Sequence, residues 1–520
     1  MLLNIFDADR ESKASHRFCT LWERNSDEVT VGQVGSVRRP QTASTHPPRM
    51  ARKPKSVSHR ASESRADGST AKRPYLVLCT TMSTGHFSPT LQIADYMIQR
   101  GFEATIITDA SHRQHVKAVG ARYVELPAFM PSPEAMEERK ALKTGFEAMI
   151  WGLTEVVVKR MPLHYGTLRD TLAALRREVP GREVVVIHDV VFLGANPLAS
   201  GAPLPEGFTK RPPIINLNLV PLQIPSVDVG PFGLALPPDS SESGRARNKA
   251  LTHVYNLPQG PFGPFTRDFR AMMESLGAVA PADDAFTAIT MNPDVMLQAC
   301  SPSLEYPRSD LPANIKFIGC LPCKTPAPTW QYPEWWSEVV GAAGSQRKRI
   351  VGVAQGTVAL DYNKLAVPAM QGLAGRDDVL VVVVLGVKGA SLPEGTVIPA
   401  NARVVDVLPY EALLPHLDVW VINFGYGGFT QGVMHGVPML LAGDTEDKAE
   451  VSMRGEWAGV GYNLRTGSST PEQVAEGVSH VLANPGYKKR VMEIREENMA
   501  MKSLETVERY VWELAGGTSI

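Results

Sequence analysis

Two regular patterns of apolar and polar positions follow one another once the chain passes residue 74. A continuous apolar run over 75–80 predicts a buried strand, and a second run over 104–108 predicts the next one. Between them apolar residues recur at helical spacing, which predicts a helix with Ser88 as its N-cap, Pro89 in its first turn and Gly101 just beyond its end. A strand, a helix and a strand in this order indicate a parallel sheet that binds ligands at the carboxyl ends of its strands.

The pattern recurs further along the chain and then starts again as a second unit. An apolar run over Val184–Ile187 predicts another buried strand and places Asp189, together with the neighbouring histidine, at a strand end. Three more runs, over 350–354, 379–385 and 419–422, predict the strands of the second unit. Both halves of the chain are therefore expected to be α/β.

A glycine-rich turn directly follows the last of these strands. It reads Asn-Phe-Gly-Tyr-Gly-Gly over 423–428, and the helix after it is expected to stop at Gly436, before a return strand over 439–442. In such a turn the backbone N–H groups and the helix dipole meet the oxygens of a phosphate. The second unit is therefore expected to hold a phosphate-bearing substrate.

A proline-rich, aromatic passage separates the two units. Its rings, Trp330, Tyr332, Trp335 and Trp336, are interpreted as linker packing rather than as a platform for a sugar. The fold class is α/β, with two Rossmann-like domains whose parallel sheets face one another across a cleft. The predicted division is a disordered tail over 1–72, a Rossmann-like domain over 73–323, a linker over 324–345, a second Rossmann-like domain over 346–490 and a C-terminal helix over 491–520 that crosses back to the first domain.

Composition narrows the class of protein. The 520 residues, 43% of them hydrophobic, suffice for two or three domains with separate cores. A formal net charge of −1 lacks the positive charge that a nucleic-acid partner requires. Apolar runs stay well short of the about 20 residues that span a bilayer, and five scattered cysteines make no disulfide framework. We expect no nucleic-acid partner, no transmembrane segment and a reducing, cytoplasmic location.

The first 72 residues are rich in Ser, Arg, Lys and Pro and poor in apolar residues. They cannot bury enough apolar surface to offset the entropy lost on ordering. Acidic residues near the start, such as Asp7 and Glu11, argue against a transit peptide, which is poor in acidic residues. A disordered tail is the interpretation that we favour.

Several short motifs occur in an order and spacing typical of one family. They are Gly-His-Phe-Ser-Pro over 85–89, Val-Ala-Gln-Gly-Thr over 353–357, the turn over 423–428, His-Gly-Val-Pro over 435–438 and Glu-Asp-Lys over 446–448. With these motifs the chain resembles the UDP-glycosyltransferase superfamily, most closely its macrolide-glycosyltransferase-like branch, from Tyr75 to Ala515. The resemblance implies the GT-B fold, a nucleotide-sugar donor bound mostly by the second domain and a small hydroxylated acceptor bound mostly by the first.

The resemblance also assigns the chemistry of the first domain. His86 stands where such enzymes place the base that deprotonates the acceptor, and the unperturbed pKa of histidine suits that task. Asp189 resembles the carboxylate that orients this base. The plainer interpretations are that His86 only helps to start a helix and that Asp189 is a solvated loop carboxylate, with His188 beside it and Asp109 at another strand end. The implied reaction is a single inverting displacement of the diphosphate.

On the donor side, the glycines of the turn would hold the diphosphate, Gln431 the ribose hydroxyls, and Asp447 with Lys448 the sugar hydroxyls. Together the implied donor-binding residues are Gln355, Gly356, Thr357, Asn423, Gly425, Gly427, Gly428, Gln431, Asp447 and Lys448.

Three departures from the family pattern keep part of this assignment open. Many relatives have histidine in place of Asn423 and a hydroxyl side chain in place of Gly428. The tryptophan that stacks on uracil in plant relatives has no counterpart over 407–410, so a TDP-sugar is an alternative to a UDP-sugar. The oligomeric state and the identity of the acceptor are not encoded in any of these motifs, although the proline-rich segment over 226–233 resembles the acceptor-side region of the branch.

Two other functions stay open at this point: a sugar-nucleotide epimerase of the same fold, and a non-catalytic protein that binds a sugar nucleotide and activates another transferase. Cys320 and Cys323 have the spacing of a redox dithiol but do not open a helix after a strand, which disfavours redox chemistry. No cluster of His, Cys or Asp has metal-ligand spacing. We therefore predict no metal ion and no cofactor besides the nucleotide sugar itself.

Overall fold

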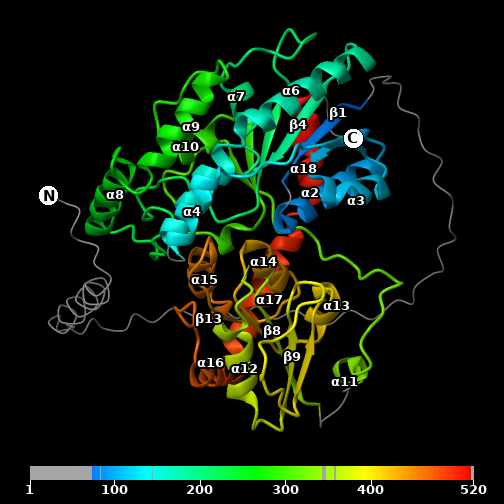
Figure 1. Ribbon diagram of the computed structural model, residues 1–520, viewed down its shortest axis with the longest axis vertical. Helices are drawn as coiled ribbons and strands as arrows, with labels where there is room; N and C mark the ends of the chain where they lie inside the picture. Colours follow the sequence, from blue (N-terminus) through cyan, green and yellow to red (C-terminus); the bar gives the residue numbers. More distant parts are fainter. Residues whose placement is uncertain (1–72, 82, 143–144, 342–346, 357–358, 517–520) are drawn as a thin grey trace, which may run out of the picture. The chain divides into compact units, whose positions relative to one another are not determined.

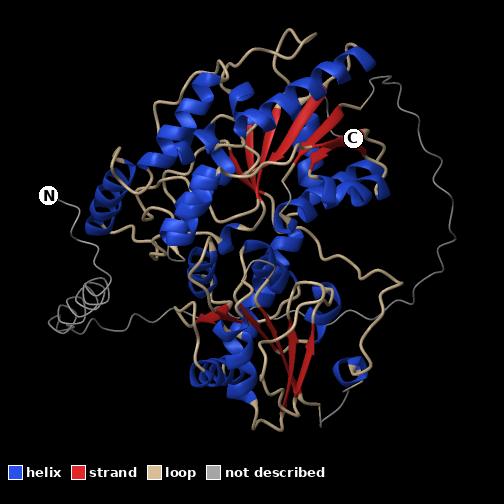
Figure 2. Ribbon diagram, viewed as in Figure 1, coloured by secondary structure: helices blue, strands red, loops and turns tan. Residues whose placement is uncertain are grey.

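A computed structural model describes residues 73–81, 83–142, 145–341, 347–356 and 359–516. Within them, everything from the first strand to the last helix belongs to one compact unit, Thr70–Ile520. The predicted tail and Thr357 lie outside the described residues. Helices surround two separate sheets of parallel strands (Figure 2). We call the seven-stranded sheet with its helices the first lobe, and the six-stranded sheet with its helices the second lobe.

The sheet of the first lobe has the order β3-β2-β1-β4-β5-β6-β7. Its interior strand β1 pairs in parallel with both β2 and β4, so that Leu78 lies between Ile106 and Ile187. Loops that follow β1 and β4 therefore leave the same edge of the sheet side by side. The strands are β1 (Tyr75–Cys79), β2 (Ala104–Thr108), β3 (Arg122–Glu125), β4 (Val184–Asp189), β5 (Ile214–Asn218), β6 (Val295–Gln298) and β7 (Ile315–Phe317).

Alternating side chains of β1 enter two different cores, as the period of a strand requires. Val77 and Cys79 pack among the helices of one face, whereas Leu76 and Leu78 pack among those of the other. Such a strand is buried on both sides, which explains its continuous apolar sequence. The helices of this lobe are α2 (Thr84–Gln99), α3 (Arg113–Ala118), α4 (Pro133–Ala141), α5 (Phe146–Trp151), α6 (Met161–Glu178), α7 (Ala195–Ala199), α8 (Glu242–Asn256), α9 (Gly263–Ser275) and α10 (Ala285–Met291), with a π-helix over Gly152–Val158 and short 3₁₀ turns at Ala110–His112 and Pro302–Leu304.

The helix after β1 begins one turn earlier than its sequence predicts. The carbonyl of Ser83 accepts hydrogen bonds from the N–H groups of His86 and Phe87, so α2 starts at Thr84 and contains Pro89. Ser88 is therefore not the N-cap, and this prediction was wrong. The earlier start places Phe87 in the core, stacked on His112 with ring centroids 3.7 Å apart, and this burial outweighs the hydrogen bond that Pro89 cannot donate. The helix ends at Gln99, with Arg100 as its C-cap and Gly101, whose φ is +86°, just beyond its end as predicted.

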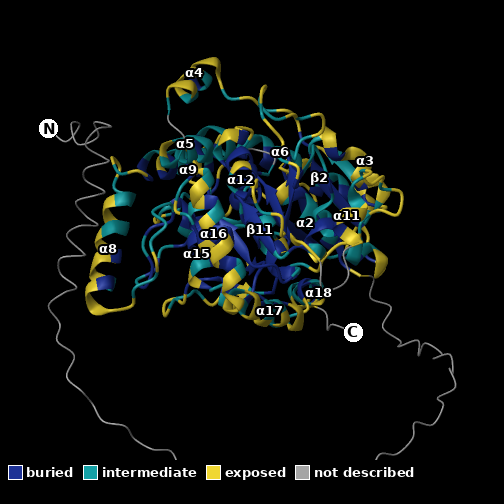
Figure 3. Cartoon of the chain, turned by 90° about the horizontal axis from the view of Figure 1, so that it is seen from below, coloured by how far each residue is buried: buried dark blue, intermediate teal, exposed yellow. Residues whose placement is uncertain are grey.

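The sheet of the second lobe has the order β10-β9-β8-β11-β12-β13, again all parallel. Its strands over 349–354, 379–384 and 419–422 agree with the apolar runs of the sequence within one residue. Figure 3 shows these strands as buried, while the outward faces of helices such as α17 are exposed. The strands are β8 (Arg349–Ala354), β9 (Val379–Val384), β10 (Ala402–Val405), β11 (Val419–Ile422), β12 (Met439–Leu441) and β13 (Gly461–Asn463).

Helices cover both faces of the second sheet, and α16 begins with a capping box made by Thr470 and Gln473. Trp335 and Trp336 of the linker pack against the core of this lobe, in agreement with the packing role predicted for them. The helices are α11 (Trp336–Val340), α12 (Ala366–Leu373), α13 (Tyr410–Leu413), α14 (Tyr426–Met434), α15 (Lys448–Trp457), α16 (Pro471–Ala483) and α17 (Pro485–Ala500), with 3₁₀ turns at Tyr362–Lys364 and Leu414–His416.

The end of the described chain returns to the first lobe (Figure 1). After α17 the backbone turns at Lys502, whose φ is +49°, and α18 (Ser503–Leu514) packs its buried Val507 and Val511 into the core beneath α2. Glu508 of α18 pairs with Arg100 at 2.5 Å. The two sheets are thus joined by the last helix as well as by the linker. Among the described residues, no helix combines the length and the apolar character that a membrane span needs.

Candidate active site

His86 and Asp189 meet at the carboxyl edge of the first sheet. His86 lies in the first turn of α2, directly after β1, and Asp189 is the last residue of the neighbouring strand β4. Nδ1 of His86 is 3.5 Å from Oδ1 of Asp189, and the side chain of Asp189 is fully buried whereas that of His86 is 15% exposed. The histidine therefore keeps a path to solvent while its carboxylate partner does not.

Backbone N–H groups hold the carboxylate of Asp189 from three directions. Val191 and Phe192 donate to Oδ1 at 2.9 and 3.2 Å, and Thr81 donates to Oδ2 at 3.3 Å. Burial by itself raises the pKa of Asp189, but the charge of His86 and hydrogen bonds that include the one from Val191 lower it by more, so its pKa lies below the ordinary value. Asp189 is therefore ionised and fixed in place.

The same pair sets the protonation of the histidine. Burial lowers the pKa of His86, but the charges of Asp189 and Asp447 raise it by more, so the net shift is upward. The neighbouring His188 differs, because it is fully buried, its Nδ1 lies 2.9 Å from the carbonyl oxygen of Asp189, and burial lowers its pKa. Of the two histidines, His86 is the one placed to exchange a proton with a ligand.

The glycine-rich turn lies between β11 and α14, with Gly425 as the N-cap of the helix. A Cβ added to Gly427 would meet no described atom within 4 Å, so this part of the first helical turn is open. A Cβ added to Gly428 would instead collide with the ring of Phe424. Packing against Phe424 thus requires glycine at position 428. At position 427, glycine leaves the backbone of the helix terminus accessible.

Asp447 faces this helix terminus from the start of α15. Its Oδ2 accepts a hydrogen bond from the N–H of Tyr426 at 3.3 Å, and a Cβ on Gly425 would lie 3.0 Å from its Oδ1. A carboxylate therefore occupies a place where the dipole of α14 favours an anion. Burial raises the pKa of Asp447, an effect that the hydrogen bond from Tyr426 and the charge of His86 only partly offset. The charges of His86 in the first lobe and Asp447 in the second thus act on one another's pKa.

The other predicted donor residues are less uniform. Lys448 is buried, with its Nζ 2.7 Å from Oγ1 of Thr445 and 2.9 Å from Oε2 of Glu446. Asn423 is buried after β11, and its Oδ1 has no hydrogen-bond partner among the described residues. Gln431 is exposed on α14. Asn423 therefore keeps an unused acceptor, but this atom is buried against Gly443, and Lys448 is held by its own loop.

Gln355 and Gly356 follow β8, and both have a local structural role. The amide of Gln355 donates to the carbonyls of Ala359 and Asp361 at 3.1 and 2.9 Å and accepts from the N–H of Ala366 at 2.9 Å. It thereby ties the end of β8 to Ala359, Asp361 and the start of α12. Gly356 has a φ of +75°, a backbone conformation that strains other residues. Thr357, the next residue, lies outside the described part of the chain.

Sequence reasoning missed a group of charged residues between the lobes. Glu450 and Arg454 on α15 are buried, and they contact Glu305 and the loop after β5 in the first lobe. Their signal in the sequence was spacing, because Asp447, Glu450 and Arg454 follow one another by three and four residues and so share one helix face.

Within the described residues there is no group of three or more His, Cys, Asp or Glu that could hold a metal ion. Among those residues the cysteines are free, and burial raises the pKa of Cys320 well above its ordinary value. Since the thiolate is the reactive form, this raised pKa disfavours a redox role for Cys320.

Comparison with known proteins gives consistent matches over most of the chain. Residues 370–514 match the family described as "Erythromycin biosynthesis protein CIII-like, C-terminal domain". The chain is 40% identical to UDP-glucosyltransferase 1 of Beauveria bassiana (strain ARSEF 2860) over 440 residues, which cover 84% of this chain and 94% of that relative. It is 34% identical to UDP-glucosyltransferase B1 of Starmerella bombicola, over 85% of this chain and 99% of that protein.

Solved structures of glycosyltransferases have the same fold. The glycotransferase of kitacinnamycin matches with a TM-score of 0.60 and 20% identity, over 85% of this chain and 100% of that one. The spinosyn rhamnosyltransferase SpnG, solved in complex with thymidine diphosphate, matches with a TM-score of 0.54 and 17% identity, over 84% of this chain and 99% of that one. The arrangement of two parallel sheets is thus the GT-B fold, as the sequence predicted.

Proposed function

Because the chain belongs to the UDP-glycosyltransferase family, as its identity to full-length UDP-glucosyltransferases shows, we propose that it moves a hexose from a UDP-sugar to a hydroxyl of a small, hydrophobic acceptor, with inversion. The observation that carries this proposal is the His86–Asp189 pair, 3.5 Å apart at the edge of the first lobe. The charge of Asp447 in the second lobe also raises the pKa of His86. A base at this place lies between the acceptor lobe and the phosphate-binding turn.

In the proposed reaction, Nε2 of His86 takes the proton of the acceptor hydroxyl, since Nδ1 faces the carboxylate of Asp189. Asp189 keeps the imidazole in one tautomer and stabilises the imidazolium that forms. The acceptor oxygen attacks the anomeric carbon from the face opposite the nucleotide, and the diphosphate departs. Its new charge is met by the N–H groups at the start of α14, where Asp447 now accepts from Tyr426.

The donor is proposed as UDP-glucose, because relatives identical at 34–40% over most of the chain are UDP-glucosyltransferases. A structural neighbour at 17% identity was solved with thymidine diphosphate, which keeps a TDP-sugar as the competing donor. A hydrophobic acceptor is supported by α5, which places the partly buried Phe146 and Met149 against Gly233 of the loop after β5.

Mass spectrometry of products formed from UDP- and TDP-sugars with a mixed panel of hydroxylated aromatic and aliphatic acceptors tests this function. We expect a product heavier than the acceptor by one hexose, and NMR should show a β-glycoside from the α-linked donor. Conversion of the nucleotide sugar without an acceptor would favour an epimerase. Tight binding of UDP without turnover on any acceptor would favour the non-catalytic partner, for which the unusual Asn423 and Gly428 are the supporting residues.

Metal independence is part of the same proposal. The described residues offer no carboxylate cluster to hold a divalent ion on the diphosphate, so the terminus of α14 must stabilise the leaving group. Turnover should be unchanged after treatment with EDTA and after addition of Mg²⁺ or Mn²⁺. Activity that EDTA abolishes and a divalent ion restores would contradict the proposed donor site.

A further inference from the structure

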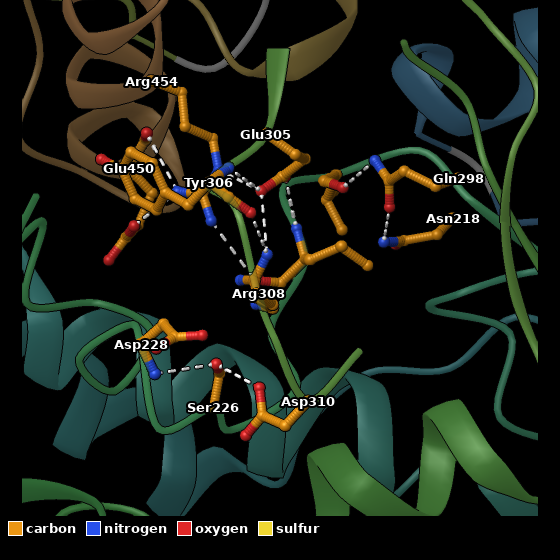
Figure 4. Close-up of polar contacts among 12 residues, drawn as sticks. Asn218, Ser226, Asp228, Gln298, Glu305, Tyr306, Arg308, Asp310, Glu450 and Arg454 are labelled. Atoms are coloured by element: carbon orange, nitrogen blue, oxygen red, sulfur yellow. Dashed lines mark hydrogen bonds and ion pairs between the residues drawn. The ribbon is translucent and has the colours of Figure 1, made fainter. Parts of the chain in front are cut away.

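Four buried charged side chains connect the lobes (Figure 4). Arg454 of α15 donates from Nε to Glu305 at 2.9 Å and from Nη1 to Glu450 at 2.7 Å. Arg308 lies 3.3 Å from Glu305, and the guanidinium of Arg454 covers the ring of Tyr306 at 4.4 Å. The exposed fraction of the four charged side chains does not exceed 5%. Two carboxylates and two guanidinium groups thus balance in charge where water is excluded.

These side chains also hold the loop that follows β5, which has no helix or strand of its own before α8. Oε1 of Glu450 accepts from the N–H groups of Gly233 and Ala235 at 2.7 and 2.8 Å. Both residues have positive φ, +94° and +51°, so the backbone curls around the carboxylate of the other lobe. Nearer β5, Leu222 donates its N–H to Glu305 at 2.8 Å and offers its carbonyl to Arg454 at 3.3 Å. The loop is anchored at both places by one ionic network.

Helix α15 links this network to the phosphate-binding turn. Asp447 at its N-terminus accepts from the N–H of Tyr426 at 3.3 Å, in the place proposed for the diphosphate. Glu450 and Arg454 follow on the same face, three and seven residues later. Asp447, at the end of α15 that would contact the donor, is therefore about one helical turn from Glu450, which holds the acceptor-side loop. Both residues belong to one rigid element.

We propose that α15 couples donor binding to the acceptor-side loop, with Glu450 and Arg454 as positioning residues that shape the loop over 222–236. This inference rests on the proposed function, because it takes the donor to bind at the start of α14. A nucleotide that contacts both α14 and the first turn of α15 restrains Glu450 and so orders the loop that it holds. By linkage, an acceptor that orders the loop strengthens donor binding by the same factor.

Hydrogen exchange measured by mass spectrometry on the full chain, with and without UDP, tests the coupling without need of an acceptor. In the wild type, UDP should slow exchange in the peptide that contains Gly233 and Ala235. In the wild type, one oxygen of Glu450 accepts from the loop and the other accepts from Arg454. In Glu450→Gln one of these oxygens becomes an NH₂ group, which is a donor, so the side chain cannot make both sets of hydrogen bonds. Exchange of this peptide should become at least about tenfold faster without UDP, and UDP should still bind but should no longer slow this exchange.

Glu456→Gln is the matched control. It removes the same charge from the same helix, but Glu456 pairs at 3.0 Å with Arg465 of its own lobe. It should behave as the wild type. If Glu450→Gln does not fold, the double variant Glu450→Gln/Arg454→Met serves, since it removes one charge of each sign and leaves Glu305 paired with Arg308. With an acceptor found in the panel above, the KM of the acceptor should rise in these variants by a larger factor than the KM of the donor.

Each outcome separates the two proposals. Equal loop exchange in the wild type and Glu450→Gln would overturn the role of Glu450, even if UDP binds and turnover is normal. UDP that binds the wild type but leaves loop exchange unchanged would overturn the coupling alone. Failure of both UDP and TDP to bind the wild type would overturn the proposed function, and the coupling with it. If Glu450→Gln and Glu456→Gln changed the exchange of the loop equally, Glu450 would have no specific role in the coupling, and the proposal would be overturned.

Discussion

At His86, burial and two carboxylates act in opposite directions on one imidazole. Burial favours the neutral ring, whereas Asp189 and Asp447 favour the protonated ring and prevail. A base must be neutral to accept a proton, so a raised pKa shifts the loss of activity to a higher pH. His86 is thus a stronger base than an ordinary histidine, but it becomes protonated, and so inactive as a base, at a higher pH.

The acid limb of kcat/KM should therefore lie above the ordinary histidine pKa of about 6.5. In Asp189→Asn the largest effect that raises the pKa is gone, so the limb should move to lower pH while kcat falls, because the ring loses its fixed orientation. Asp109→Asn is the control, since Asp109 follows the neighbouring strand β2 and should leave the limb in place. An acid limb at the same pH in wild type and Asp189→Asn would show that His86 is not the titrating base.

Substitution of His86 should affect mainly the chemical step, whereas substitution of Asn423 should affect mainly donor binding. His86→Ala should lower kcat by about 10²–10⁴-fold with little change in the affinity for UDP, as expected for a lost general base. Asn423→Ala should lower donor affinity and kcat by a smaller factor, because a neutral hydrogen bond contributes less than an ionic one. Steady-state kinetics with UDP titrations check both. Full activity of His86→Ala with every acceptor would refute the assignment of the base.

At the scale of one element, the first turn of α14 has two adjacent glycines with different surroundings. Gly428→Ala should lower the free energy of unfolding by about 1–3 kcal/mol, because its methyl group meets the ring of Phe424. Gly427→Ala should be neutral or stabilising by up to about 1 kcal/mol and should weaken UDP binding, because its methyl group projects into open space at the helix terminus. Urea unfolding and UDP titration measure the two effects. UDP affinity unchanged in Gly427→Ala would move the diphosphate away from this turn.

At the scale of the molecule, Arg454 is a cation buried between two carboxylates of different lobes. Arg454→Met should lower the free energy of unfolding by about 3–5 kcal/mol, because Glu450 loses its cation and Glu305 keeps only Arg308. Arg465→Met, which removes an exposed partner of Glu456, should change it by no more than about 0.5 kcal/mol. Urea denaturation followed by circular dichroism compares them. A similar small loss in both variants would mean that the interlobe charges are hydrated in solution.

Much of the fold could be predicted from the sequence because the strands are buried on both faces. The runs over 104–108 and 419–422 became β2 and β11 residue for residue, since a strand between two helical layers excludes charged side chains and tolerates only small polar ones such as Thr105 and Thr108. Local signals were less reliable where burial competed with them. Ser88 and Pro89 match a helix start, yet α2 begins at Thr84 because Phe87 gains more from entering the core.

The candidate site divides in the same way. The sequence by itself determined the residue types and their positions at strand ends and in the glycine-rich turn, because these depend on neighbours along the chain. Only the tertiary structure brought Asp189 to His86, through the pairing of β1 with β4, and Asp447 to the start of α14. Only it revealed that Glu450 holds Gly233 at 2.7 Å, across 217 positions of sequence. Contacts of this kind depend on how two lobes pack, and no local pattern of apolar and polar residues encodes that packing.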